Sequence, residues 1–573
     1  MLSAKVNPSP TSVRAYKVVV RSVAQVRSRE RRRVVVLAVL VALVTAILAW
    51  LLPRSLLGAF GFLGAVVLAP AALYWLWERP VRGVYILFAA ALLQETDYGS
   101  VVYPDDLGYY TPIFQDIATW SHISGISFSI AELFMVLMLL IWLLKGLAAR
   151  SFRFDKGSLM RPLALYIALV VIGEGHGLAT GGDFKLSLWE VRSQAYMFIA
   201  YVLACNLVRT RKELNVLVWS VIVGGGIKGI QGCVRYYLEP HGHLETLLSH
   251  EQSFFWNAAL TLTAILFLYG GSRRLKTAAL VFLPFILIAD IANNRRAGVV
   301  ALGVGIVTLL VVTVVAHPAR RRVALAILCL GAILWLPYYS VYKTKDGLIA
   351  EPARAVYSNS HPDPRDASSN LYRDNENADL IFTMKSSLLN EVIGFGFGKR
   401  FYTPHSLDVI SGAYIFYNLL PHNSILWIWM RVGSIGFFIF WVLIATAIMQ
   451  AMQLAIKLRE PYLKGLAVFI GVMIMQQILV GYLDLQWVNY RNLIMTGVLF
   501  ALLSKLSLFD REPEPERVLS ARVTVAVRHA MGVVSPSLAV AGDRLTRRSP
   551  IVVPGGSRLD HGETAVKTKE LVQ

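Results

Sequence analysis

Two neighbouring arginines, Arg295 and Arg296, stand in a short connection between apolar runs at residues 276–291 and 297–315. Guanidinium groups bind phosphates and carboxylates through paired hydrogen bonds and keep their charge at any working pH. Arg192 lies near the end of another apolar run, two residues after Glu190. Charged side chains inside or at the edge of a membrane span cost free energy, so by default they mark a functional interior. For any single one of these residues, a structural ion pair or a snorkelling side chain is the alternative explanation. The adjacent arginine pair therefore predicts an anionic ligand.

A second group of candidate residues lies in the longest polar segment, residues 341–427. This segment is expected to hold an amphipathic helix from Arg373 through Leu389, then alternate glycines at residues 394–398, then Lys399 and Arg400. Glycines let a backbone approach a ligand closely, and the cations that follow supply positive charge. The pattern is not a dinucleotide fingerprint, because a preceding strand and a directly following helix are missing.

His422 and Asn423 end the polar segment, just before an apolar run at residues 428–450. Imidazoles titrate near neutral pH, so His422 is the candidate general base for taking a proton from an attacking hydroxyl. Hydrogen bonding to a ligand without proton transfer fits the sequence equally well, and a structural histidine at a helix mouth is the common alternative. Asn423 would orient one of the bound groups.

Neither a metal nor another cofactor is expected. The run Asp374-Asn375-Glu376 is not an Asp-x-Asp motif, and it is interpreted as the solvated face of a helix. A looser group has ligand types that suit zinc but flexible spacing and no cysteine: His241 and His243 with Glu245 or His250. The three cysteines of the chain show no metal-type spacing either.

The elements that must position these residues are membrane helices. The 573-residue chain is 56% apolar and only 16% charged, with a mean hydropathy of +0.55, which excludes an ordinary soluble protein. A spanning helix needs about 20 mostly apolar residues. An all-α polytopic membrane fold with about fourteen spans is predicted, at residues 34–52, 56–77, 81–95, 127–147, 162–180, 187–207, 213–230, 255–271, 276–291, 297–315, 323–340, 428–450, 463–482 and 492–508.

The net charge of +20 is explained by membrane topology rather than by nucleic acid, because the basic residues cluster between apolar runs. With a cytoplasmic basic N-terminus (residues 1–33), every second connection is cytoplasmic and carries Lys or Arg, as the positive-inside rule requires. Spans 1–11 then occupy residues 34–340, the long loop 341–427 is extracytoplasmic and partly helical, and spans 12–14 occupy residues 428–508. Residues 509–573 form a cytoplasmic tail with little packed structure.

Several motifs in this order resemble the O-antigen ligase and polymerase family of bacterial inner-membrane proteins. They are Asn293-Asn294-Arg295-Arg296-Ala297-Gly298, Arg373 ahead of an amphipathic helix, the glycines of residues 394–398, His422-Asn423-Ser424-Ile425-Leu426, and Arg431-Val432-Gly433-Ser434-Ile435-Gly436. The resemblance covers residues 187–450 well. Relatives typically show Ser-Arg-Gly where this chain has Arg295-Arg296-Ala297, so Arg296 takes the motif position.

The resemblance implies a transfer of a glycan from an undecaprenyl diphosphate carrier to an acceptor hydroxyl on the periplasmic face. The donor diphosphate would be held by Arg296 and Arg192, with Arg295, Arg373, Lys399, Arg400 and Asn423 as further binding residues and His422 as the base. The implied partners are this lipid-linked donor, a glycan or lipid acceptor, the bilayer, and other polysaccharide-assembly proteins. A transporter or flippase of the same lipid-linked glycan is the alternative, and a scaffold subunit a third; ligase and polymerase are not separated by the sequence.

Overall fold

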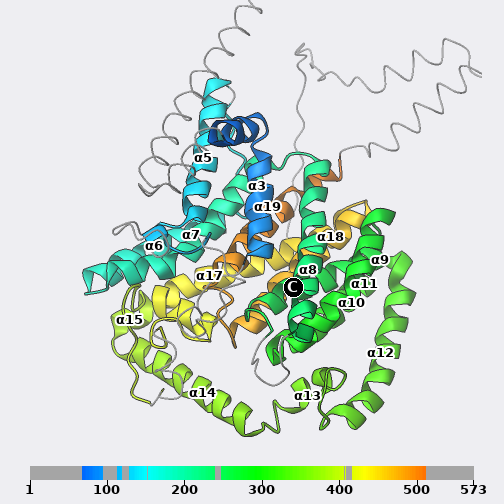
Figure 1. Ribbon diagram of the computed structural model, residues 1–573. Helices are drawn as coiled ribbons and strands as arrows, with labels where there is room; N and C mark the ends of the chain where they lie inside the picture. The colour runs from blue at the N-terminus through cyan, green and yellow to red at the C-terminus, as the bar shows by residue number, and fades with distance from the viewer. Residues whose placement is uncertain are drawn as a thin grey trace, which may run out of the picture. The chain divides into compact units, whose positions relative to one another are not determined.

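A computed structural model describes residues 68–94, 113–118, 128–150, 152–238, 247–405, 407 and 416–511. About 78% of these residues are helical, and no strand occurs among them. The predicted first span, most of the second and nearly all of the predicted cytoplasmic tail lie outside the described residues. The helices of Figure 1 belong to one unit that ends at Asp510.

Ten helices of the described part are long and apolar enough to cross a membrane. They are α5 (Ile130–Ala148), α6 (Met160–Ala179), α8 (Arg211–Leu238), α9 (Gln252–Tyr269), α10 (Arg273–Ala292), α11 (Arg296–Ala316), η1 with α12 (Pro318–Arg320 and Arg321–Tyr342), α17 (Ser424–Lys457), α18 (Pro461–Gly481) and α19 (Tyr490–Phe509). The chain is therefore an all-α, multi-pass membrane protein, as the apolar runs predict.

Two further helices correspond to predicted spans in the described region. The helix α3 (Val81–Leu93) is apolar but short, and α7 (Phe184–Leu207) is long but carries buried polar residues such as Glu190 and Arg192. These charges are tolerated because α7 lies inside the bundle, where it packs against α19. The close packing depends on Gly497, since a Cβ there would lie 2.2 Å from the carbonyl oxygen of Met197.

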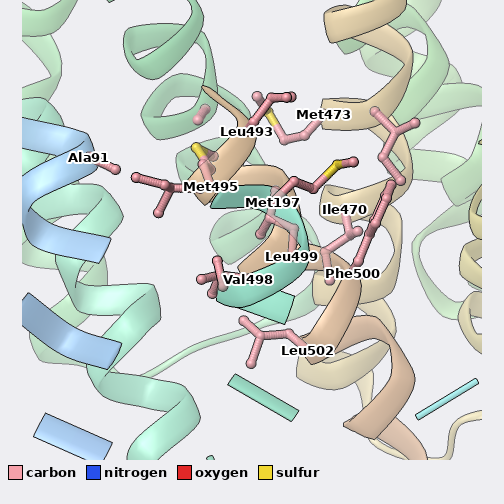
Figure 2. Packing of buried hydrophobic residues seen from close by; sticks show 14 of the residues in the cluster. Ala91, Met197, Ile470, Met473, Leu493, Met495, Val498, Leu499, Phe500 and Leu502 are labelled. Atoms are coloured by element: carbon pink, nitrogen blue, oxygen red, sulfur yellow. The ribbon is translucent and has the colours of Figure 1, made fainter. Parts of the chain in front are cut away.

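The centre of the bundle is a continuous apolar core. Figure 2 shows Met197 of α7 among side chains of α19, including Leu493 and Leu499, with Ile470 and Met473 of α18 beside them. By contrast, α12 buries only Ala324 and packs mainly on α11 and α13, so nearly all of its apolar surface faces outward. Such a helix needs lipid as its solvent.

The described residues of the long polar segment contain three helices between α12 and α17: α13 (Glu351–Tyr357), α14 (Pro364–Lys385) and α15 (Leu388–Val392). In Figure 1 they run along one end of the bundle, from the end of α12 to the start of α17. The predicted amphipathic helix starts earlier than expected, because Asp363 Oδ1 caps α14 by accepting a 2.7 Å hydrogen bond from the N–H of Asp366, and Pro364 fits the first helical position. Arg373 consequently lies in mid-helix, and the helix ends at Lys385 rather than at Leu389.

Candidate active site

A cavity of about 630 Å³ opens where this polar segment meets the bundle. Its walls come from the start of α9, the start of α11, α13, the first half of α14, and the end of α18. The charged residues and histidines that line it are His250, Arg295, Arg296, Lys343, Asp346, Glu351, Arg354, His361, Asp363, Asp366, Arg373 and Asp484. Both predicted motif arginines and Arg373 therefore face one hollow, which we call the arginine cavity.

The turn before α11 fixes the two neighbouring arginines. The buried Asn293 amide oxygen accepts hydrogen bonds from the backbone N–H groups of Leu247 and Leu248, at 3.0 and 2.9 Å. Asn294 follows with a φ of 56°, a left-handed conformation that asparagine tolerates better than most residues. This turn makes Arg295 the N-cap residue of α11 and Arg296 its first residue. The two asparagines thus direct the chain so that both arginines reach the cavity.

Arg296 is bound to a carboxylate in the cavity. Its Nη1 lies 3.1 Å from Asp366 Oδ2 and donates to Ser358 Oγ at 3.3 Å. Arg354 is paired likewise, with Asp346 at 2.8 Å and Glu351 at 2.6 Å. An anionic ligand would therefore have to compete with protein carboxylates for both of these guanidinium groups.

Arg373 differs from those two arginines. Its Nη1 donates to Ser369 Oγ at 2.8 Å, one turn earlier on α14, and no carboxylate among the described residues lies within ion-pair distance. Its Nε is buried without a hydrogen-bond partner in the described part of the chain. A buried N–H group without a partner costs free energy. Of these three arginines, Arg373 is therefore the one best prepared to bind an added anion.

His422 is held beside the arginine cavity by Glu376 of α14. Glu376 Oε2 accepts from the backbone N–H of His422 at 2.8 Å, and Oε1 lies 3.3 Å from the ring Nδ1. The carboxylate is 1% exposed, and Tyr372 packs edge-on against the imidazole with ring centroids 5.5 Å apart. A carboxylate only accepts, so Nδ1 must carry the proton in the neutral ring and Nε2 keeps a lone pair. Nε2 makes no hydrogen bond with any described residue.

The cavity wall beside His422 carries a carboxylate, Asp484. Burial acts to raise the pKa of Asp484, but the positive charge of nearby Arg295 and the hydrogen bond from the N–H of Leu485 act against it, and the pKa lies below its ordinary value. Desolvation by the surrounding protein lowers the pKa of His250, and the positive charge of nearby Arg295 lowers it further. The exposed surface of the His250 side chain faces the arginine cavity. At neutral pH the wall beside His422 therefore carries an anionic Asp484 and a neutral His250.

Four predicted binding residues lie outside the lining of the arginine cavity: Arg192, Lys399, Arg400 and Asn423. Arg192 forms buried ion pairs with Asp116 at 2.5 Å and Glu132 at 3.0 Å. Lys399 donates to Thr180 Oγ1 at 2.8 Å, and its Nζ lies 4.0 Å from the ring centroid of Phe395. Arg400 hydrogen-bonds the side chain of Asn418. Arg192 thus matches the structural ion pair that was the alternative interpretation.

The glycines of residues 394–398 contact protein backbone, which corrects the expectation that they approach a ligand. All three have positive φ, between 77° and 107°. A Cβ on Gly396 would lie 2.5 Å from Cα of Gly177, and one on Gly394 would lie 2.4 Å from the carbonyl oxygen of Arg431. The loop is therefore wedged between α6 and α17, where only glycine fits.

A fully buried ion pair holds this loop in place. Arg431 Nη2 lies 2.5 Å from Glu190 Oε1, and both side chains have no exposed surface. Arg431 Nη1 also donates to the carbonyl oxygens of Gly396 and Lys399, each at 2.8 Å, while Glu190 Oε2 accepts from the N–H of Gly398 at 2.7 Å. The pair joins α7 to α17 and fixes the segment that leads to His422.

Glu376 and Asn423 show what the sequence concealed. The run Asp374-Asn375-Glu376 was predicted to be the solvated face of a helix. This is right for Asp374, which is exposed, and wrong for Glu376, which is buried against His422. Asn423 caps α17 by accepting from the N–H of Leu426 at 3.0 Å, and its Nδ2 donates to Asn377 Oδ1 at 3.1 Å. The only local signal for Glu376 was its position one helical turn after Tyr372, which is also buried.

The described residues include no group of three or more His, Cys, Asp or Glu side chains arranged to hold a metal ion. His241, His243 and Glu245 lie outside the described residues. The chain matches no protein-family model and no curated protein.

Proposed function

We propose that the protein is a metal-independent membrane glycosyltransferase that moves a glycan from an undecaprenyl diphosphate carrier to an acceptor hydroxyl. One observation carries this proposal: four arginines line a single cavity, and a histidine oriented by a buried carboxylate stands beside it. A cavity of about 630 Å³ is within the usual range for small-molecule sites. The arrangement supplies an anion site and a base, the two parts that this transfer needs.

The donor diphosphate would bind Arg373 first, because this guanidinium lacks a carboxylate partner among the described residues. Arg296 would exchange Asp366 for a phosphate oxygen, with Arg295 beside it on the same turn. Charge on the diphosphate grows as its bond to the sugar breaks. Guanidinium groups fixed around it therefore stabilise the transition state more than the bound donor.

The transfer step balances with the groups present. The acceptor oxygen forms a bond to the anomeric carbon of the donor sugar, and the bond from that carbon to the diphosphate oxygen breaks. The acceptor proton passes to Nε2 of His422, which becomes an imidazolium stabilised by Glu376. Undecaprenyl diphosphate leaves as an anion bound by the arginines.

The lining of the cavity also supports a lipid-linked donor over a soluble one. The wall also contains apolar residues: Val300 and Val304, one and two turns after the arginines on α11, Leu479 of α18, and Leu483 just after α18. Val304, Leu479 and Leu483 are each more than a third exposed. A carrier with an anionic head and a long apolar tail matches a cavity whose wall has both arginines and exposed apolar side chains.

The proposed orientation places this site on the extracytoplasmic face of a bacterial inner membrane. The start of α11, the end of α12, the start of α17 and the end of α18 all contribute to the site or adjoin it. The opposite ends of these helices adjoin Arg320–Arg322 and Lys457–Lys464, which the positive-inside rule assigns to the cytoplasm. Fourteen spans and two cytoplasmic termini remain part of the proposal.

A reconstituted transfer reaction tests the proposal. The full chain, purified in detergent, should join glycan from undecaprenyl diphosphate to an acceptor fraction from the producing cell without nucleotide sugar. His422→Ala should lower the rate by about a hundredfold or more while the protein stays folded. The matched control is His405→Ala, because His405 is held by Asp379 of α14 in the same way, with Nδ1 2.7 Å from Oδ1. The surroundings of the two histidines differ: Glu376 and Asn423, beside His422, line a smaller hollow next to the arginine cavity, and neither His405 nor Asp379 lines either one.

The same assay separates the transferase from a transporter. No membrane has to be crossed in detergent, so a transporter or flippase would show no joining of glycan to acceptor. Transfer at the wild-type rate by well-folded His422→Ala protein would overturn the assignment of the base.

A further inference from the structure

A second, smaller cavity of about 120 Å³ adjoins the arginine cavity on α14. It is lined by Asn370, Arg373, Asp374, Glu376, Asn377, Asn423, Tyr482 and Leu483. Asn370, Arg373 and Leu483 line both cavities, so the two hollows meet at the Arg373 side chain. We call the smaller one the amide cavity.

The side chains of the amide cavity differ in chemistry from those of the arginine cavity. Three amides, two carboxylates and one phenol surround it, with a single arginine at the shared wall. Asp374 and Glu376 outnumber Arg373, so a second phosphate group would meet two carboxylates there and be repelled. Amide and carboxylate groups suit a ligand whose hydroxyls both donate and accept hydrogen bonds.

Several of these polar groups have hydrogen-bonding capacity left for a ligand. Asn377 uses its Oδ1 to accept from Asn423 Nδ2 at 3.1 Å, which leaves its own NH₂ group to donate. The Asn370 amide and the Asp374 carboxylate make no side-chain hydrogen bond with any described residue. A volume of about 120 Å³ holds several waters, which is about the space of one sugar ring.

The amide cavity also lies next to the proposed base. Glu376, one of its lining residues, bonds both the backbone N–H and the ring Nδ1 of His422, and Asn423 is the next residue in the chain. A ligand hydroxyl in this cavity would therefore be near His422, with the arginine cavity beyond Arg373. The two cavities provide separate places for the anionic and the neutral reactant.

We propose that the amide cavity is the acceptor subsite and that it binds an uncharged, hydroxyl-bearing sugar ring. This inference rests on the proposed transfer. The acceptor hydroxyl forms its bond to the anomeric carbon of the donor, its proton goes to His422, and the diphosphate leaves into the arginine cavity. Asn370 and Asn377 select a sugar by hydrogen bonding, and Tyr482 supplies an aromatic ring at the rim, 44% exposed.

Ligand-observed saturation-transfer NMR on the full chain in nanodiscs tests this subsite directly. The probes are the methyl glycosides of glucose, galactose, mannose and N-acetylglucosamine. At least one should bind the wild type, and Asn370→Ala and Asn377→Ala should each weaken that binding about fivefold, the usual effect of losing a hydrogen bond. Asn390→Ala is the matched control, because Asn390 is an amide on neighbouring α15 that lines neither cavity.

A second measurement covers binding too weak for NMR. Asn370→Cys in a Cys329→Ser background should react with a maleimide, since the remaining native cysteines, Cys205 and Cys233, are buried. The same glycosides should slow this reaction, and should not slow it at Asn390→Cys. A hollow that holds only water would show neither NMR transfer nor protection, and that result would overturn the inference.

The subsite and the transferase proposal fail in different ways. Glycoside binding that survives in His422→Ala, together with no transfer by the wild type, would leave the sugar site standing and remove the transferase. Transfer by the wild type, with unchanged acceptor KM in Asn370→Ala and Asn377→Ala, would leave the transferase standing and remove the sugar site. Saturating undecaprenyl diphosphate should not displace the glycosides, because it occupies the other cavity.

Discussion

Glu376 holds His422 at two points: Oε2 accepts from its backbone N–H at 2.8 Å, and Oε1 lies 3.3 Å from its ring Nδ1. The first bond fixes the chain at the mouth of α17, and the second fixes the orientation of the ring. Because the carboxylate can only accept, the neutral imidazole has its proton on Nδ1 and a lone pair on Nε2. The pair therefore prepares His422 to take a proton.

Replacing Glu376 by Gln tests this role of the carboxylate. The glutamine side chain can still accept from the backbone N–H, but its NH₂ group can donate to Nδ1 and so move the ring proton to Nε2. We expect kcat to fall about tenfold or more with little change in acceptor KM, because the ring is kept in the wrong tautomer. Rates at saturating donor and acceptor measure this. Asp379→Asn, the equivalent change at His405, should leave kcat unaltered; equal losses in both variants would point to a structural role instead.

Asp366 competes with the donor for Arg296, so Asp366→Asn should strengthen donor binding. The carboxylate lies 3.1 Å from the guanidinium, and both side chains are about four-fifths buried, at 19% and 22% exposure. Removing this charge should raise the affinity for undecaprenyl diphosphate roughly threefold to tenfold. Titration of the lipid into protein-bearing nanodiscs gives the affinity. Asp346→Asn is the control, because Arg354 keeps its contact with Glu351 at 2.6 Å. Weaker donor binding in Asp366→Asn would show that Asp366 orients Arg296 for the ligand.

Arg431 should prove essential to folding rather than to the reaction. Its pair with Glu190 is completely buried, so Arg431→Ala leaves an unpartnered carboxylate and frees the loop carbonyls of Gly396 and Lys399. Such changes cost roughly 3–5 kcal/mol. We expect poor expression and a markedly lower thermal unfolding temperature. Arg400→Ala, in the same segment but exposed, should retain the wild-type Tm. A stable but inactive Arg431→Ala protein would instead place Arg431 in the chemistry.

The stability contributed by Asp484 should depend on pH in a defined direction. The pKa of this carboxyl is lowered in the folded protein. The contribution of Asp484 to the free energy of unfolding is therefore fully present above the ordinary aspartate pKa of about 3.9. It is lost as the pH falls through the lower pKa of the folded protein. Asp484→Asn should lower Tm by roughly 2 °C at pH 7, and the difference from wild type should shrink below about pH 4. Thermal unfolding followed across this range measures it. A difference that grows with acid would contradict the sign of the shift.

The sequence by itself determined the class of fold and the membrane helices, because crossing a bilayer is a local requirement on about 20 consecutive residues. The span predicted at residues 297–315 corresponds to α11 (Arg296–Ala316), and the span predicted at 463–482 corresponds to α18 (Pro461–Gly481). The arginine pair before α11 could also be recognised, since two cations in a short connection oppose the charge pattern of the chain.

Only the tertiary structure decided which charges are partners. Glu376 is far from His422 in the chain, and nothing local distinguishes this buried carboxylate from the exposed Asp374 beside it. The glycine loop likewise gave no sign that its close contacts would be with α6 and α17 rather than with a ligand. Arg192 and Arg296 are both arginines near span ends, yet one closes a buried ion-pair cluster and the other lines a cavity. Pairing depends on distances between distant segments, and those distances are fixed only when the helices pack.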